Sequence, residues 1–269
     1  AWSRVQGREK MRPKPQETVS QWGARIFGRS FTDRVLATGL QGIYAGDITK
    51  MSATLVFSAF FQPSKPKRGR LRGTVSGPRG MGEVIEALVQ WLQDRGVAIH
   101  FESKVSPSQL LSGSWIVATN APSAADLLRE VSPENAALLQ QVEMLPLVSV
   151  TTFFPPDSNQ DVRAFGCLFG RSSPARSLGV LFNSDLFAGR SSKRSETWIL
   201  GGRNDPEIMQ STDSELLGQI LQDRQLLQSQ VAEPLNFYVT RWPQAIPHYT
   251  LHLEQVISSL KPMENVCLI

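Results

Sequence analysis

Cysteine is scarce in this 269-residue sequence, which holds only Cys167 and Cys267. Two cysteines so far apart make no disulfide framework and no metal-ligand spacing, and they are typical of a reducing compartment. Long apolar runs are also missing, because the best candidate, Met51 to Phe61, contains three hydroxyl residues and is too short to cross a bilayer. Neither a disulfide-stapled fold nor a membrane-spanning helix is therefore expected in these residues.

The residue constellations of hydrolytic and metal-dependent catalysis are missing as well. We find no Ser/His/Asp arrangement, no paired carboxylates and no G-x-G-x-x-G phosphate loop. His248 and His252 stand four residues apart, but Pro247 precedes them and a third ligand is not evident, so we expect no metal site. On this basis no side chain of the chain itself is nominated as a catalytic group.

The net charge of +4 conceals an uneven distribution. Residues 1–72 contain 14 Lys and Arg against 4 Asp and Glu, whereas the rest of the chain has an acidic excess. A basic segment beside apolar stretches indicates nucleic-acid binding, attraction to an anionic membrane surface, or simply a solvated face. No recognition motif accompanies the charge, so we expect no nucleic-acid partner.

The order of predicted elements indicates an α+β fold. Helices are expected at about 17–28, from Thr32 as N-cap toward Gly39, and at 81–96, where apolar residues recur with helical spacing. The alternation of Val97, Ile99 and Phe101 predicts a strand, and further helices are expected at 123–131 and 133–142. Strands are predicted at 115–119, 147–154, 164–169, 178–183, 197–201, 235–242 and 266–269, with one more helix at 213–228. This pattern predicts a mixed or antiparallel sheet with packed helices.

The most informative segment is Gly42-Ile43-Tyr44-Ala45-Gly46-Asp47, between a predicted helix and the run that starts at Met51. Glycine permits positive φ angles and close backbone approach, so the segment predicts a helix C-cap and turn with a packing or ligand-contact demand. It also resembles the G-x-Y-A-G-D signature of the protoporphyrinogen oxidases, flavoproteins of the amine-oxidase type.

Other segments extend this resemblance in the family's order over roughly residues 16–269. They are Glu17-Thr18-Val19-Ser20 with Ala24-Arg25-Ile26-Phe27-Gly28, Lys50-Met51-Ser52, Gly80-Met81-Gly82, Phe165-Gly166-Cys167-Leu168, Leu178 to Phe187, Gly201-Gly202 and Arg241 to Tyr249. The chain is therefore identified as a member of this family. The resemblance implies a mostly helical, membrane-contacting unit (1–95), a remnant of an FAD-binding domain (96–125), a substrate-binding sheet (126–255) and a return toward the FAD domain (256–269).

The activity implied by the resemblance is flavin-dependent oxidation of a porphyrinogen to a porphyrin. By matching position, Phe165, Leu168 and Tyr249 would bind the substrate, while Val105, in an expected strand, and Thr119 and Trp242 would contact FAD. As bare residues, Val105, Phe165, Leu168, Trp242 and Tyr249 have an alternative role in ordinary core packing. The chain departs from the family where His248 replaces the usual Gln and where no glycine stands near Leu251 and His252.

The missing phosphate-binding glycines and the abrupt ends lead us to expect a fragment that does not hold FAD tightly by itself. Two alternatives stay open: another amine-oxidase-type flavoprotein resembling the carotenoid desaturases, and a non-catalytic module that binds porphyrin or membrane. A cytoplasmic protein with peripheral membrane association is expected, with Lys65, Lys67, Arg68, Arg70 and Arg72 contributing to the basic rim. A homodimer is a further expectation.

Overall fold

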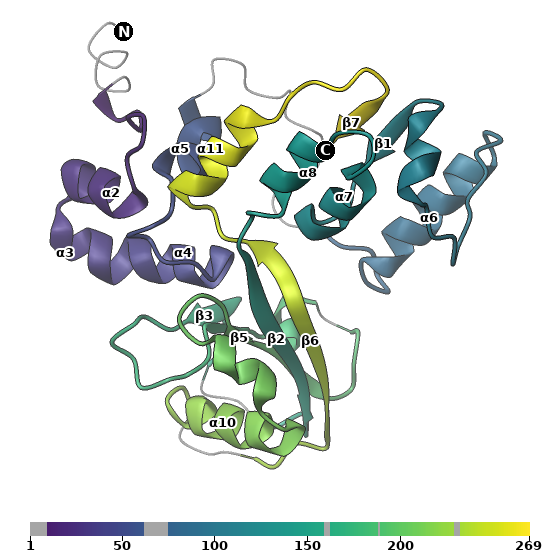
Figure 1. Ribbon diagram of the computed structural model, residues 1–269. Helices are drawn as coiled ribbons and strands as arrows, with labels where there is room; N and C mark the ends of the chain where they lie inside the picture. The colour runs from purple at the N-terminus through teal and green to yellow at the C-terminus, as the bar shows by residue number, and fades with distance from the viewer. Residues whose placement is uncertain (1–9, 62–74, 159–161, 188, 229–231) are drawn as a thin grey trace, which may run out of the picture.

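The computed structural model describes residues 10–61, 75–158, 162–187, 189–228 and 232–269. Figure 1 shows a broad layer of helices, which also carries a short two-stranded sheet, and below it a five-stranded sheet packed against helix α10. This mixture of helices with a largely antiparallel sheet confirms the predicted α+β class.

The N-terminal helices form the first part of this layer. Helix α2 (Val19–Phe27) begins at Thr18, whose hydroxyl accepts from the Gln21 N–H while the Gln21 side chain accepts from the Thr18 N–H. After Gly28 at φ 84° the chain is helical through α3 (Arg29–Phe31), the π-helical η1 (Thr32–Leu36) and α4 (Ala37–Tyr44). The predicted N-cap at Thr32 is wrong, because Gly28 already supplies the break and the next helix starts directly after it.

A second group of short elements completes the helical unit, which is the part of the layer formed by residues 18–61 and 249–259. They are α5 (Ala53–Phe57), η2 (Ser58–Phe61) and α11 (Leu251–Ser259), the last of which returns from the far end of the chain to lie beside α5 in Figure 1. Buried residues include Val19, Trp22, Leu40 and Met51. Tyr44 of the hexapeptide and Tyr249 both pack against this cluster, so segments separated by some two hundred residues share one hydrophobic core.

The remaining part of the helical layer surrounds a two-stranded parallel sheet. Strand β1 (Trp115–Val117) pairs with β7 (Val266–Leu268), which confirms that the apolar run near the end of the chain is a strand. Around it stand α6 (Gly82–Gln93), η3 (Pro107–Leu111), α7 (Ala121–Leu128) and α8 (Pro133–Leu139). Asn120 caps α7 by accepting from the Ser123 N–H, so the helix starts two residues before its predicted position.

The strand predicted at 97–101 is wrong. Val97 and Phe101 are exposed, and no strand is assigned there or around Val105. Alternation alone does not make a strand, because the backbone also needs a neighbouring strand to complete its hydrogen bonds. Among the described residues, the ladders join only β1 with β7 and the five strands of the larger sheet, so 97–101 has no partner.

The larger sheet has the strand order β3-β4-β5-β2-β6 and is antiparallel throughout. Its strands are β2 (Met144–Phe154), β3 (Gly166–Leu168), β4 (Gly179–Leu181), β5 (Arg194–Gly201) and β6 (Asn236–Pro247). One face carries Val148, Val150, Val180 and Trp198, which pack against Ile208 of η4 (Pro206–Gln210) and against α10 (Asp213–Gln225). The short helix α9 (Asn183–Leu186) follows β4.

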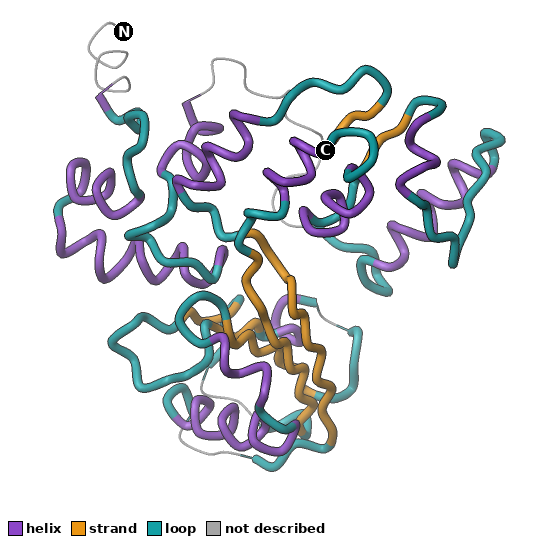
Figure 2. Tube along the Cα trace, in the orientation of Figure 1, coloured by secondary structure: helices purple, strands orange, loops and turns teal. Residues whose placement is uncertain are grey.

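Strands β2 and β6 connect the sheet with the helical layer, as Figure 2 shows. Their pairing extends from Phe153 opposite Asn236 to Met144 opposite Pro247, with a shift in register between Leu145 and Leu147. The start of β2 and the end of β6 therefore lie at the same end of the sheet, close to the turn that follows α4. The proposed division of the chain at residues 95, 125 and 255 stays a prediction.

Candidate functional site

The hexapeptide 42–47 forms the end of α4 and the turn after it. Ala45 is the left-handed C-cap, at φ 50°, and its N–H donates to the Gln41 carbonyl at 2.8 Å. Such a conformation closes a helix and redirects the chain, usually at glycine. The predicted helix end and turn are confirmed, with Ala45 rather than a glycine in the left-handed position.

The two glycines of the hexapeptide serve close packing. A Cβ added to Gly42 would lie 2.4 Å from Leu168 Cδ2, and one added to Gly46 would lie 2.9 Å from Met51 Sδ and 3.0 Å from His248 Cδ2. All three distances are shorter than van der Waals contact, so larger residues would displace these neighbours. The turn is thus held between β3 on one side and the end of β6 on the other.

Polar contacts fix the same turn. The Ala45 carbonyl accepts from the Arg203 N–H at 2.9 Å, and Asp47 Oδ1 lies 3.0 Å from an Arg171 guanidinium nitrogen. Burial pushes the pKa of the Asp47 carboxyl upward, but hydrogen bonds from the Thr49 N–H and hydroxyl together with Arg171 outweigh it. The pKa therefore lies below its ordinary value, and Asp47 is charged at neutral pH.

The face of the sheet opposite α10 is the open face. The register aligns its residues in four rows: Leu168, Gly179, Ile199, Ser149 and Thr240; Gly166, Leu181, Thr197, Thr151 and Tyr238; Gly201, Leu147 and Trp242; and Ser195, Phe153 and Asn236. None of these side chains is charged: the apolar residues of the first two rows lie on β3, β4 and β5, and their hydroxyl residues lie on β5, β2 and β6. Neighbouring strands lie about 4.8 Å apart, so five strands span roughly 19 Å. The open face is therefore wide enough for a large, flat, apolar ligand.

Two predicted substrate residues lie at the β3 end of the sheet. Leu168 is 45% exposed on the open face, in contact with Gly42, and Phe165 is 60% exposed just before β3. The third, Tyr249, lies instead at the helical core, where its ring is 4.9 Å from that of Tyr44. Both Leu168, in β3, and Tyr249, which follows β6, thus contact the hexapeptide, the first at Gly42 and the second at Tyr44.

The predicted cofactor residues Val105 and Thr119 line one cavity of about 550 Å³. Its other lining residues are Ser103, Lys104, Pro107, Ser123, Asp126, Leu127 and Arg129. Trp242 lies on the open face, 54% exposed, and two residues later Gln244 Oε1 approaches Asn120 Nδ2 at 3.5 Å. Six of these nine lining residues are polar or charged, so the cavity offers hydrogen-bonding groups that suit the polar nucleotide end of a dinucleotide cofactor.

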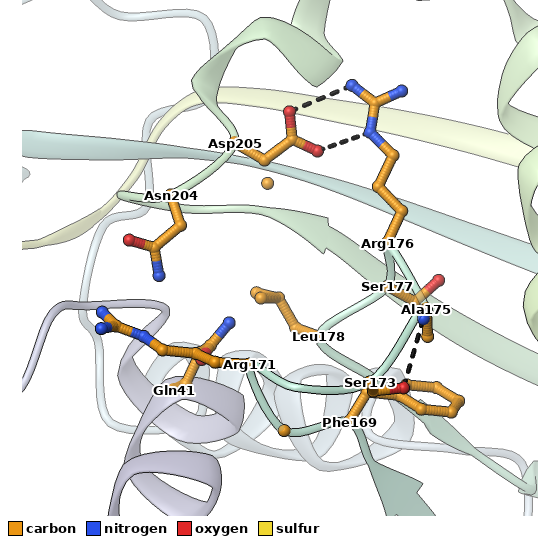
Figure 3. Close-up of a pocket in the computed structure, with 12 residues that line it drawn as sticks. Gln41, Phe169, Arg171, Ser173, Ala175, Arg176, Ser177, Leu178, Asn204 and Asp205 are labelled. Carbon is orange, nitrogen blue, oxygen red and sulfur yellow. Dashed lines mark hydrogen bonds and ion pairs between the residues drawn. The ribbon is translucent and has the colours of Figure 1, made fainter. Parts of the chain in front are cut away.

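A second cavity, of about 510 Å³, lies between α4 and the loops 169–178 and 201–205 (Figure 3). Arg171 and Gln41 stand on one side of it, and on the other Arg176 holds Asp205 through two hydrogen bonds of 2.7 and 3.0 Å. Asp223 of α10 accepts from the N–H groups of Arg176 and Ser177 and so fixes the end of the loop 169–178. The arginines of this cavity are already paired with carboxylates.

Sequence reasoning missed the ion pairs of Arg171 with Asp47 and of Arg176 with Asp205. Arg171 is 124 residues from Asp47 along the chain, and nothing in the local pattern indicates the pairing. The sequence marks His248 by its spacing from His252 and by its departure from the family pattern, but neither signal indicates its partners. Both of its ring nitrogens are used, one by Glu143 and one by Asp47, and the described residues contain no group of three metal-ligating side chains. In the part of the chain that the structure describes, the site therefore consists of surfaces and positioned hydrogen bonds.

Comparison with known proteins places this geometry in context. The model of a family described as "Flavin containing amine oxidoreductase" matches residues 2–107 and 114–268. The chain is 24% identical over 312 residues to the chloroplastic protoporphyrinogen oxidase of Nicotiana tabacum, covering 95% of this chain and 57% of the relative. It is 21% identical over 282 residues to the coproporphyrinogen III oxidase of Bacillus subtilis (strain 168), covering 92% and 60%.

Solved structures share the fold. A protein named as a candidate protoporphyrinogen oxidase from Exiguobacterium sp. 255-15 superposes with a TM-score of 0.70 and 18% identity, covering all of this chain and 67% of that one. The cyclohexylamine oxidase of Brevibacterium oxydans IH-35A gives a TM-score of 0.61 at 14% identity, covering 99% and 68%. The chain spans a little over half the length of the tobacco relative and a similar share of the bacterial one.

Proposed function

The chain belongs to the flavin-containing amine oxidoreductase family, and we propose that it takes part in oxidising a porphyrinogen to a porphyrin with FAD as cofactor. The observation that carries the proposal is the open face, which presents Leu168, Leu181 and Trp242 beside hydroxyl groups and no charge. A flat macrocycle gains most from a flat apolar support, because both its burial and its ring contacts scale with area. Relatives named for two porphyrinogens support this substrate class.

The residues of the chain divide the work of binding in this proposal. Val105 and Thr119 in the 550 Å³ cavity would hold the adenine end of FAD, and Trp242 would stand near its ring. When bound, FAD supplies the hydride acceptor, which accounts for the absence of a nominated catalytic side chain. Phe165 and Leu168 would contact the tetrapyrrole. Tyr249 would contribute indirectly, because its ring packs against that of Tyr44 in the hexapeptide.

Substitution on the open face tests this assignment. Leu168→Asp places a charge where the macrocycle would lie, and Leu226→Asp is its matched control on the other side of the sheet, since the two leucines are 45% and 49% exposed. Porphyrin binding is measured by quenching of tryptophan fluorescence. We expect Leu168→Asp to raise the dissociation constant at least about tenfold and the control to leave it unchanged. Equal affinity in both variants would remove the open face as the binding surface.

The binding titration, combined with oxidation assays, separates the alternative functions. Binding of porphyrin without any oxidation of porphyrinogen by the FAD-loaded protein would favour a binding module. Oxidation of an amine with no response to either porphyrinogen would favour another branch of the family, whose fold the cyclohexylamine oxidase shares. Parallel assays with protoporphyrinogen IX and coproporphyrinogen III would identify the preferred substrate.

We also propose that the helical unit contacts a membrane surface. Its aromatic rings form a continuous series, Phe31–Phe27–Trp22–Phe57–Phe60, with successive centroids 4.2 to 6.4 Å apart. Both ends are open to solvent, Phe31 at 44% and Phe60 at 71% exposure. Within the described residues, no helix is long and apolar enough to span a bilayer, so the proposal is peripheral contact. The basic residues 65–72 lie outside the described residues.

Sedimentation with vesicles tests this contact. Vesicles that contain anionic lipid should bind the protein at low salt and release much of it at high salt, because surface charge interactions are screened. Phe60→Asp should weaken binding at every salt concentration, and Phe101→Asp, at an equally exposed phenylalanine outside the aromatic series, should not. No sedimentation even at low salt would remove the proposal.

A further inference from the structure

His248 follows β6 directly and is 1% exposed, yet its ring lies between two polar groups. Its Nδ1 is 2.8 Å from Glu143 Oε2, and the Asp47 N–H donates to its Nε2 at 3.1 Å. Gly46 leaves room for this arrangement, since a Cβ there would lie 3.2 Å from Nε2. The histidine therefore joins the hexapeptide turn to the residue that precedes β2.

The two contacts define the state of the ring. A backbone N–H can only donate, so Nε2 must present its lone pair to Asp47, and the ring proton then resides on Nδ1. From Nδ1 it is donated to the Glu143 carboxylate. One neutral tautomer satisfies both hydrogen bonds, and the opposite tautomer would satisfy neither.

Further contacts hold the hydrogen-bonded bridge Glu143–His248–Asp47 in place. The His248 N–H donates to the Glu143 carbonyl at 2.8 Å, so the two residues are also joined through the backbone. Glu143 Oε1 lies 3.4 Å from Arg203 Nε, and the Asp47 carboxylate is turned toward Thr49 and Arg171. The bridge thus links the end of α4 with both long strands that lead into the sheet.

We propose that His248 is a positioning residue, which fixes the turn 42–47 against β2 and β6 so that Gly42 meets Leu168 at the margin of the open face. Through the contact of Gly42 with Leu168, His248 would set the distance between the helical unit and the open face, the gap in which the macrocycle would lie. The inference rests on the proposed function for what occupies that gap. The bridging geometry itself does not depend on it.

The chain suggests a conservative replacement, because a glutamine side chain also offers one acceptor and one donor. Gln at position 248 can accept from the Asp47 N–H and donate to Glu143, whereas Leu can do neither. Glu143→Ala gives a second route to the same loss at a residue whose side chain is 47% exposed and whose removal is tolerated more easily by the fold. His252→Gln, at an exposed histidine of α11, is the matched control.

Porphyrin affinity is the first readout, measured with protoporphyrin IX by tryptophan quenching. We expect His248→Leu to raise the dissociation constant about tenfold, Glu143→Ala to raise it severalfold, and His248→Gln to restore it to within about twofold of wild type. His252→Gln should have no effect. Unchanged affinity in soluble, folded His248→Leu or Glu143→Ala would overturn the proposal, as would a loss in His248→Gln equal to that in His248→Leu.

Ring-nitrogen NMR is the second readout and needs no ligand. Long-range ¹H–¹⁵N spectra should show His248 as a single neutral tautomer protonated at Nδ1, and the Asp47 amide should exchange faster in His248→Leu. A wild-type protein that binds no porphyrin but shows this tautomer would count against the proposed function alone. A His248 protonated at Nε2, or a mixture of tautomers, would overturn the bridge whatever the ligand result.

Discussion

The Leu168 side chain lies directly against the backbone of Gly42, so that a Cβ at residue 42 would come within 2.4 Å of Leu168 Cδ2. This contact brings the end of α4 to the edge of the sheet and joins the most distinctive segment of the sequence to the open face. It also explains why glycine stands at a helical position, where it is intrinsically unfavourable.

Gly42→Ala should displace Leu168 and weaken porphyrin binding by about tenfold, with little loss of stability, because Leu168 is half exposed and its side chain can move aside. Gly39→Ala is the matched control, since it lies in the same helix with nothing within 4 Å of the added Cβ. It should stabilise the protein by about 0.5–1 kcal/mol and leave binding unchanged. Binding that is insensitive to Gly42→Ala would show that the contact does not shape the site.

The buried ion pair between Glu196 and Arg224 should be essential for stability. Both side chains are fully buried, with Arg224 Nε 3.1 Å from Glu196 Oε2 and the guanidinium 3.9 Å from the Phe154 ring centre. Arg224→Met leaves the buried Glu196 carboxylate with only Arg194, at 3.6 Å, and the Trp198 indole N–H, at 3.3 Å. We expect a cost of about 3 kcal/mol, the lower end of the range for breaking a buried pair. Urea denaturation measures the change. Lys261→Met, which breaks an exposed pair with Glu134, should cost less than about 1 kcal/mol.

Acid should destabilise the helical unit through Glu17. The hydrogen bond from Arg25 holds the pKa of the Glu17 carboxyl below its ordinary value, in spite of the opposing effect of burial. The unfolded state therefore binds this proton more readily than the folded state. Stability from the charged form is fully present above the ordinary value of 4.5 and is lost as the pH falls through the lower folded value.

Denaturation of wild type and Glu17→Gln at pH 7 and pH 3 measures this contribution. The wild type should be more stable at pH 7, and its advantage should shrink toward pH 3. Glu130→Gln, at an exposed glutamate after α7, is the control for removal of one surface carboxylate. An advantage of wild type that grows on acidification would contradict the assignment.

Arg190 should hold the loop that precedes α6 against the sheet. Its Nη2 donates to Ser76 Oγ at 2.8 Å and to the Gly77 carbonyl at 2.5 Å, while Nε donates to the Pro78 carbonyl at 3.3 Å. In Arg190→Ala, peptides that cover residues 75–80 should exchange amide hydrogens severalfold faster. Lys193→Ala removes a nearby positive charge and should leave this exchange unchanged; equal acceleration in both variants would indicate a general charge effect.

Much of the architecture follows from local patterns in the sequence. The alternation along 147–154 and 235–242 and the apolar run at 266–269 predict strands that the structure contains, and helical spacing predicts α6 and α10. These segments are long or strongly periodic, so the local signal decides the structure. The sheet with its packed helix could be derived from them without any family resemblance.

Pairing between distant segments could not be predicted in this way. Val97 to Phe101 alternates like a strand, yet it has no partner within the described residues and stays irregular. Contacts such as Arg171 with Asp47, or His248 with Glu143, join residues more than a hundred positions apart. They depend on how the helical unit meets the sheet, which no local pattern encodes. Family resemblance nominated Val105 and Thr119, and the structure shows that they line one cavity.

Reduction of the bound flavin under anaerobic conditions tests the central claim most directly. FAD-loaded protein that contains this chain is mixed, without oxygen, with protoporphyrinogen IX, coproporphyrinogen III or cyclohexylamine, and the visible absorbance of oxidised flavin is followed. A porphyrinogen loses six electrons in becoming a porphyrin and each flavin takes two, so the account predicts that a porphyrinogen bleaches this absorbance, with at most one porphyrin formed per three flavins reduced. Cyclohexylamine should not bleach it. Flavin that stays oxidised with both porphyrinogens but is bleached by the amine would contradict it.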